Sequence, residues 1–190
     1  MPETFDTALM IETKFQVSPA GRFQILAITA GVGNGLTFRP DVLKDSLPLW
    51  QGVSVFVDHN GTRARSVMQL AGTCSSPEWD DVEQGIRLQL TTAGPAAEVV
   101  NELGRLVLSN EVPDLNVGFS ADVSLLIDGN TVKKVIKPHS LDVVYNPARG
   151  GRFLRVLNQA HDDGQTKKEN VSMTDPVITP PAATQPPSAA

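Results

Sequence analysis

The chain has 190 residues, of which 41% are hydrophobic and 19% charged, a composition that suits one globular domain with a tail. Its net charge of −5, without a basic stripe, argues against nucleic-acid binding, and no apolar run approaches the roughly 18 residues of a membrane helix. A single cysteine, Cys74, excludes an intramolecular disulfide and, with three histidines, gives no zinc-binding spacing, so we expect no metal or other cofactor.

The first half of the chain carries mostly β signals. Apolar, β-prone residues predict strands at 23–29 and 53–58, and alternation of apolar with polar residues predicts a half-buried strand at 84–91. The glycine-dense segment 31–35 lacks the spacing of a dinucleotide-binding loop and predicts a turn. Residues 40–47, with proline in the first turn, predict a short helix.

The second half predicts one longer helix and a hairpin. Apolar residues recur at helical spacing over 95–109, which indicates an amphipathic helix with one face on the core. Residues 117–127 and 132–136 predict two strands joined by a turn at 128–130, and 141–145 predicts a last core strand. About seven strands with two or three flanking helices indicate an α+β fold, with a mostly antiparallel β-barrel or sandwich in residues 1–157.

The composition changes sharply near residue 158. From there to residue 190 the chain is polar and then rich in proline, alanine and threonine. Such a segment buries too little apolar surface to offset the entropy of ordering it. We therefore expect 158–190 to be a disordered tail or linker.

Three polar side chains stand out because each lies in or beside an apolar, β-prone run. Alternation places Ser120 on the polar face of its strand, His59 ends the strand at 53–58, and Asp142 interrupts a strand of apolar residues. Hydroxyl, imidazole and carboxylate are the groups of a serine hydrolase, as nucleophile, base and orienting acid. Taken singly, each has a simpler explanation that the local pattern favours: a solvated serine, a turn histidine and an aspartate facing water on an edge strand. His139, which follows a proline in an expected loop, competes with His59 for the role of base.

These residues lie in segments that resemble one protein family. The segments are Gly35–Leu43, Val53–His59, Val117–Ser120 and the run Leu141–Ala148, which ends in an Asn-Pro-Ala turn. In this order and with these separations they resemble the prohead (capsid maturation) proteases of tailed bacteriophages, which are related to herpesvirus assemblin. The resemblance covers roughly residues 21 to 157.

The resemblance implies a serine endopeptidase with Ser120 as nucleophile, His59 as base and Asp142 as the third catalytic member. Assemblin completes its triad with a second histidine, so His139 is the rival to Asp142. The substrates implied are scaffolding protein, the delta segments of the major capsid protein and the enzyme itself. The implied setting is the phage procapsid in the host cytoplasm, where the protease forms a homo-oligomer without nucleic-acid or membrane partners.

The sequence also departs from the family pattern. Several relatives carry a basic residue after the serine that helps to hold the oxyanion, whereas Ala121 and Asp122 follow Ser120 here. Backbone N–H groups would then do that work, with help from an arginine. The arginines considered for this role are Arg63, Arg65, Arg149 and Arg152. A different register would place Asn116 at the nucleophile position and imply an inactive scaffold or capsid-assembly protein with the protease fold.

Overall fold

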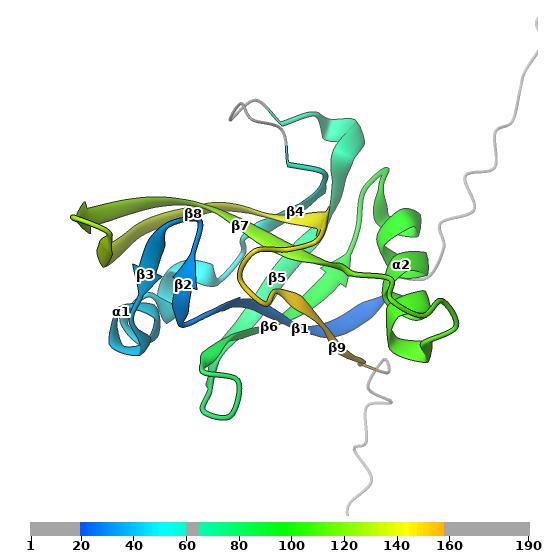
Figure 1. Cartoon of the computed structure of the whole chain (residues 1–190). Coiled ribbons are helices and arrows are strands. Elements are labelled where there is room, and N and C mark those ends of the chain that lie inside the picture. The colour runs from blue at the N-terminus through cyan, green and yellow to red at the C-terminus, as the bar shows by residue number, and fades with distance from the viewer. Residues whose placement is uncertain (1–19, 60–64, 158–190) are drawn as a thin grey trace, which may run out of the picture. The chain divides into compact units, whose positions relative to one another are not determined.

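The computed structural model describes residues 20–59 and 65–157, which form an α+β fold built on one strongly curled, mostly antiparallel sheet (Figure 1). The strands are β1 (Arg22–Thr29), β2 (Gly31–Gly33), β3 (Leu36–Phe38), β4 (Ser54–Val57), β5 (Leu70–Asp80), β6 (Gly85–Thr92), β7 (Val117–Asp128), β8 (Thr131–Tyr145) and β9 (Arg152–Val156). The helices are α1 (Pro40–Asp45) and α2 (Ala97–Ser109), with short 3-10 turns η1 (Leu47–Trp50) and η2 (Val67–Gln69).

Strand β8 is the hub of the sheet. The strand order is β2-β3-β8-β4-β5-β6-β1-β9, and β7 pairs with β8 outside this path. Only the β3–β8 and β4–β8 pairs are parallel among the strands described. A single bridge between Phe119 and Gly151 joins β7 to the residue before β9, so the edge of the sheet formed by β7 meets the edge formed by β9 there. The distal part of the β7–β8 hairpin projects beyond the other strands (Figure 1).

The core fills the inside of the curl. Phe23, Phe119 and Phe153 come from three different strands and pack ring against ring, with centroids 5.3 and 4.7 Å apart. Helix α2 closes this end of the curl with Val100, which is fully buried. Val99, the preceding apolar residue of the same helix, is half exposed. Burial of these large apolar groups is the main stabilising contribution to the fold.

The expected α+β class and antiparallel sheet are confirmed, but several details differ. The glycine-dense segment is itself a small hairpin, in which β2 and β3 pair across Asn34-Gly35. The strands expected at 132–136 and 141–145 are one strand, β8, so His139 lies in a strand and not in a loop. Strands β5 and β9 were not expected.

The tail at 158–190 lies outside the described residues. Of the two helices described, neither is long and apolar enough to cross a membrane.

Candidate active site

The end of β4 positions His59. This strand runs parallel to β8, and the Asp58 N–H donates to the Val143 carbonyl at 3.0 Å, which extends the pairing by one residue. Asp58 then adopts a left-handed conformation (φ 64°), which turns the chain out of the strand. His59 follows at this corner with its side chain 47% exposed, so the imidazole lies at the surface beside β8.

Asp142 lies in the middle of β8, between β4 and β7, and its side chain is fully buried. Its Oδ2 atom accepts a hydrogen bond from His59 Nδ1 at 2.6 Å. A carboxylate accepts from the ring N–H, so this contact places the proton of neutral His59 on Nδ1 and leaves a lone pair on Nε2. His59 therefore has the tautomer that a general base requires.

Ser120 lies directly opposite Asp142 in the antiparallel β7–β8 register. The Val143 carbonyl faces β4, so Asp142, one residue earlier, turns its backbone groups toward Ser120. The Cα atoms of such a pair lie about 5.5 Å apart, with both side chains on one face of the sheet. Ser120 is half-buried, and among the described residues no hydrogen bond joins its hydroxyl to His59. Catalytic contacts of this kind are often long without substrate.

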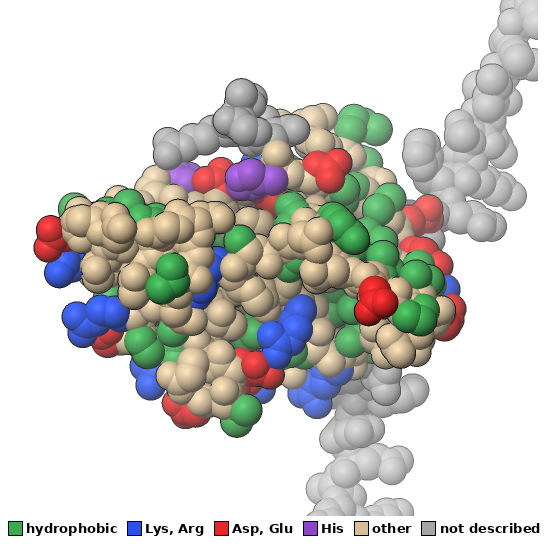
Figure 2. All heavy atoms as spheres, in the orientation of Figure 1, with side chains coloured by type: hydrophobic (Ala, Val, Ile, Leu, Met, Phe, Trp, Pro, Cys, Tyr) green, Lys and Arg blue, Asp and Glu red, His purple; other side chains and the backbone are tan. Residues whose placement is uncertain are grey.

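The structure therefore brings His59 and Asp142 into contact and places Ser120 beside them. Figure 2 shows histidine side chains at the surface along the upper margin of the molecule, whereas Asp142 is fully buried. A nucleophile, a base and an orienting carboxylate on one surface are the groups needed to attack an acyl carbon.

The edge of β7 beside Ser120 offers a backbone donor. The Phe119 N–H donates to the Gly151 carbonyl at 3.1 Å, away from β8. Backbone groups alternate in direction along a strand, so Ala121 also turns its N–H away from β8, beyond the Gly151 bridge. No other described strand pairs with β7 at Ala121. This amide is therefore available to an oxygen of a bound substrate.

A small cavity of about 130 Å³ adjoins Ser120. Its lining is mainly apolar and includes Leu36, Phe38, Val123 and Leu125. Arg149 lies in the same wall, where its guanidinium donates to the carbonyls of Val32 and Thr29 and lies over the Phe38 ring. Burial lowers the pKa of this guanidinium from its usual value. Ser120 and Ala121 both line this cavity, next to the core-facing residues Val123 and Leu125.

Of the other arginines considered for the oxyanion, two are engaged elsewhere. Arg65 Nη2 donates to Asp142 Oδ2 at 2.8 Å, and Arg152 pairs with Glu83 at 2.6 Å. Arg63 lies outside the described residues. Arg65 is thus a partner of the buried carboxylate, which corrects the role considered for it, and Arg149 is the described candidate that lines the cavity.

His139 does not take part in this arrangement. Its Nε2 atom shares a hydrogen bond with Ser124 Oγ at 2.7 Å, and the residue lines a separate surface hollow with Leu49 and Gly52. Asp142 and not His139 contacts His59, so the geometry favours the acidic third member over the second histidine of assemblin.

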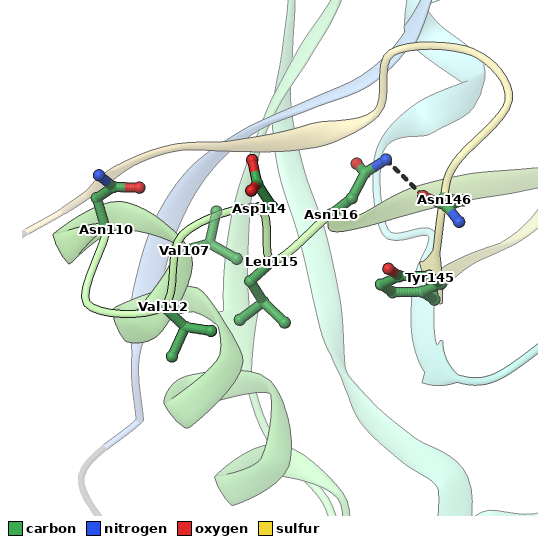
Figure 3. A pocket seen from close by; sticks show the side chains of 8 residues that line it. All are labelled: Val107, Asn110, Val112, Asp114, Leu115, Asn116, Tyr145 and Asn146. Atoms are coloured by element: carbon green, nitrogen blue, oxygen red, sulfur yellow. Dashed lines mark hydrogen bonds between the residues drawn. The ribbon is translucent and has the colours of Figure 1, made fainter.

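Asn116, the alternative nucleophile position, directly precedes β7 and lies four residues before Ser120. It lines a hollow of about 500 Å³ with Val107 and Val112 of the α2 end and the loop after it, and with Tyr145 (Figure 3). Its side chain points toward Asn146 and donates to Asn146 Oδ1 at 2.6 Å. Neither His59 nor Asp142 lines this hollow, although it is larger than the cavity beside Ser120. Of the two positions, Ser120 is the one that lies opposite Asp142 in the β7–β8 pair.

Sequence reasoning did not place three residues beside Asp142: Arg65, which was considered only for the oxyanion, Asp122 and Ser140. Arg65 Nη2 contacts Ser140 Oγ at 2.6 Å and Asp122 Oδ2 at 3.1 Å in addition to Asp142. The alternation that placed Ser120 on the polar face also placed Asp122 there, so this residue carried a usable signal. Arg65 precedes η2 outside any periodic segment, and no pattern could assign it. We call Arg65, Asp122, Ser140 and Asp142 the carboxylate cluster.

The described residues contain no group of three or more His, Cys, Asp or Glu side chains placed to hold a metal ion. No protein-family model, curated protein or solved structure matches this chain.

Proposed function

We propose that this chain is a serine endopeptidase in which Ser120 attacks the peptide carbonyl, His59 takes up the hydroxyl proton and Asp142 orients His59. The observation that carries the proposal is the 2.6 Å hydrogen bond between His59 Nδ1 and the buried Asp142, with Ser120 opposite Asp142 in the register. His59 then returns its proton to the leaving amine, and water hydrolyses the acyl-enzyme by the same route.

The surroundings of Ser120 support a peptide substrate. The Ala121 amide is a donor for the developing oxyanion, and an apolar cavity of about 130 Å³ lies along the same stretch of β7. The resemblance to prohead proteases supplies the biological setting of the proposal. Within it, the chain cleaves scaffolding protein, delta segments of the capsid protein and itself inside the phage procapsid.

A test uses the full-length protein and its own chain as substrate. Wild-type protein, Ser120→Ala and the matched control Ser124→Ala, on the same strand, are incubated after purification and followed by intact mass spectrometry. Wild type and Ser124→Ala are expected to lose discrete pieces within or near residues 158–190, and Ser120→Ala to keep its full length. Equal trimming in all three proteins would assign the cuts to a contaminating protease.

The runner-up is a scaffold or capsid-assembly protein that keeps the fold without catalysis. It predicts that wild type and Ser120→Ala behave alike both in self-cleavage and in capsid assembly. The placement of Asn116 away from His59 and Asp142 disfavours the inactive register from which this alternative arose.

A further inference from the structure

One oxygen atom of Asp142 serves two partners. Its Oδ2 atom accepts from His59 Nδ1 at 2.6 Å and from Arg65 Nη2 at 2.8 Å, while Oδ1 is buried without a hydrogen-bond partner among the described residues. Arg65 therefore does not form a bidentate pair with the carboxylate, because only its Nη2 atom donates to Asp142. The imidazole and the guanidinium share the charge of a single oxygen.

Arg65 has opposite effects on the stability of the fold and on the strength of His59 as a base. A fully buried carboxylate needs a charged or hydrogen-bonding partner, and Arg65, 13% exposed, supplies one. A base must also become positively charged when it takes the serine proton, and a neighbouring guanidinium opposes that charge. Alone, Arg65 would weaken His59 as a base.

Asp122 is placed to offset this effect. Its Oδ2 atom lies 3.1 Å from the same Arg65 nitrogen, and its side chain is only 22% exposed, so solvent screens the pair incompletely. Asp122, Asp142 and Arg65 together carry a net charge of −1. Protonation of His59 then leaves the group neutral, whereas without Asp122 the same step would leave it positive.

We propose that Asp122 is a positioning residue of this site, which neutralises Arg65 so that Asp142 keeps its full charge toward His59. The role of Asp122 in catalysis rests on the proposed peptidase function. Its effect on the charge of Arg65 does not depend on that function, because it follows from the ion pair in the folded chain. Arg65 is held for this purpose by Ser140 Oγ at 2.6 Å and by the Phe56 ring, whose centroid lies 5.6 Å from its guanidinium carbon.

Four charged side chains of the described residues either adjoin His59 in sequence or belong to the carboxylate cluster. They are Asp58 beside it at the end of β4, Arg65 before η2, Asp122 on β7 and Asp142 on β8. No hydrogen bond or ion pair joins the Asp58 side chain to the carboxylate cluster within the described part of the chain. The two substitutions that change the charge of the cluster while sparing Asp142 are thus at Arg65 and Asp122, and they should act in opposite directions.

The test measures the titration of the His59 ring by NMR in full-length Ser120→Ala protein, which cannot cut itself under the proposed function. His59→Gln assigns the resonance. Asp122→Asn, added to this background, is expected to move the His59 titration midpoint down by about half a pH unit or more. Arg65→Met is expected to move it up. Asp128→Asn, the same substitution about 20 Å further along β7, should leave the midpoint in place.

A midpoint that does not move in Asp122→Asn would overturn the proposal, as would a shift of equal size in Asp128→Asn. Asp122→Asn keeps size and shape at a partly exposed position, so the result does not depend on Arg65→Met folding. In the enzyme with Ser120 intact, Asp122→Asn should move the acid limb of the kcat/KM profile to lower pH and reduce kcat with little change in KM. The NMR arm needs no activity, so failure of the peptidase proposal and failure of the Asp122 proposal are seen separately.

Discussion

Ser120 and Asp142 face each other across the β7–β8 pair, and the same Asp142 holds His59 from the neighbouring parallel strand β4. Strand β8 thus carries Asp142, which lies next to both Ser120 and His59. Because side chains of opposed residues share a face, the register of a single strand pair decides whether the three groups can meet. A slip of one residue would turn Ser120 into the core.

Asp142→Asn is expected to lower kcat by about three to four orders of magnitude, because an amide in its place would hold the wrong tautomer of His59. His139→Ala should change kcat by less than about threefold, since its ring nitrogen contacts Ser124. Steady-state kinetics on both variants checks this, with circular dichroism to confirm folding. A large loss in His139→Ala with a small one in Asp142→Asn would instead support an assemblin-like arrangement.

Gly118→Ala is expected to destabilise the closure of the curled sheet. A Cβ atom at Gly118 would lie 2.0 Å from the Gly151 carbonyl oxygen and 2.8 Å from the Pro147 ring, so the backbone must move. We expect a loss of about 1–3 kcal/mol in unfolding free energy, or about 2–4 °C in Tm for each kcal/mol. Scanning calorimetry measures it, and Ser120→Ala, two residues along the strand, is the control that should melt near the wild-type temperature. Equal melting temperatures for both variants would show that the two strands do not approach so closely.

Ser46→Ala is expected to weaken the core without touching the site. The indole N–H of fully buried Trp50 donates to Ser46 Oγ at 3.1 Å, and this substitution leaves it without that acceptor. The unfolding free energy should fall by about 1–3 kcal/mol in chemical denaturation followed by tryptophan fluorescence. Ser109→Ala, at the exposed end of α2, is the matched control and should stay within about 0.5 kcal/mol of wild type.

Cys74 should report unfolding by its reactivity. Burial raises the pKa of its thiol to about 12, so in the folded protein at pH 8 it is both protonated and covered. A thiol reagent such as a dithiobis-nitrobenzoate is expected to react only after denaturant unfolds the chain. Rapid reaction of the native protein would contradict the burial of β5 in the core.

The sequence could predict most elements that follow one regular period. Apolar, β-prone composition identified β1 and β4. Alternation identified β6 and β7, and it set Ser120 and Asp122 on one face. Strand β5 was missed because its register shifts between Ser75 and Glu78, where Ser76 has a left-handed φ of 51° and Pro77 follows. Such a bulge interrupts the period-two pattern that marks a strand.

Pro138 likewise hides the continuity of β8 from the sequence pattern. A proline inside an apolar run usually argues against a continuous strand, but this one lies where the β7–β8 register shifts, at a point that tolerates a missing N–H. The loop expected around His139 therefore does not exist. Asp142 was recognisable as a carboxylate in need of a partner, but Arg65 comes from an aperiodic segment, and only the folded chain shows that the two meet.

The most direct test of the account is active-site labelling with a fluorophosphonate, which reacts with an activated serine and spares ordinary hydroxyls. Wild-type protein is expected to gain one adduct, located on Ser120 by peptide mass spectrometry. His59→Gln should label at least about a hundredfold more slowly, because the base that activates the hydroxyl is gone. Ser124→Ala should label at the wild-type rate. No adduct on Ser120, or equal labelling of wild type and His59→Gln, would contradict the assignment of Ser120, His59 and Asp142 as a catalytic triad.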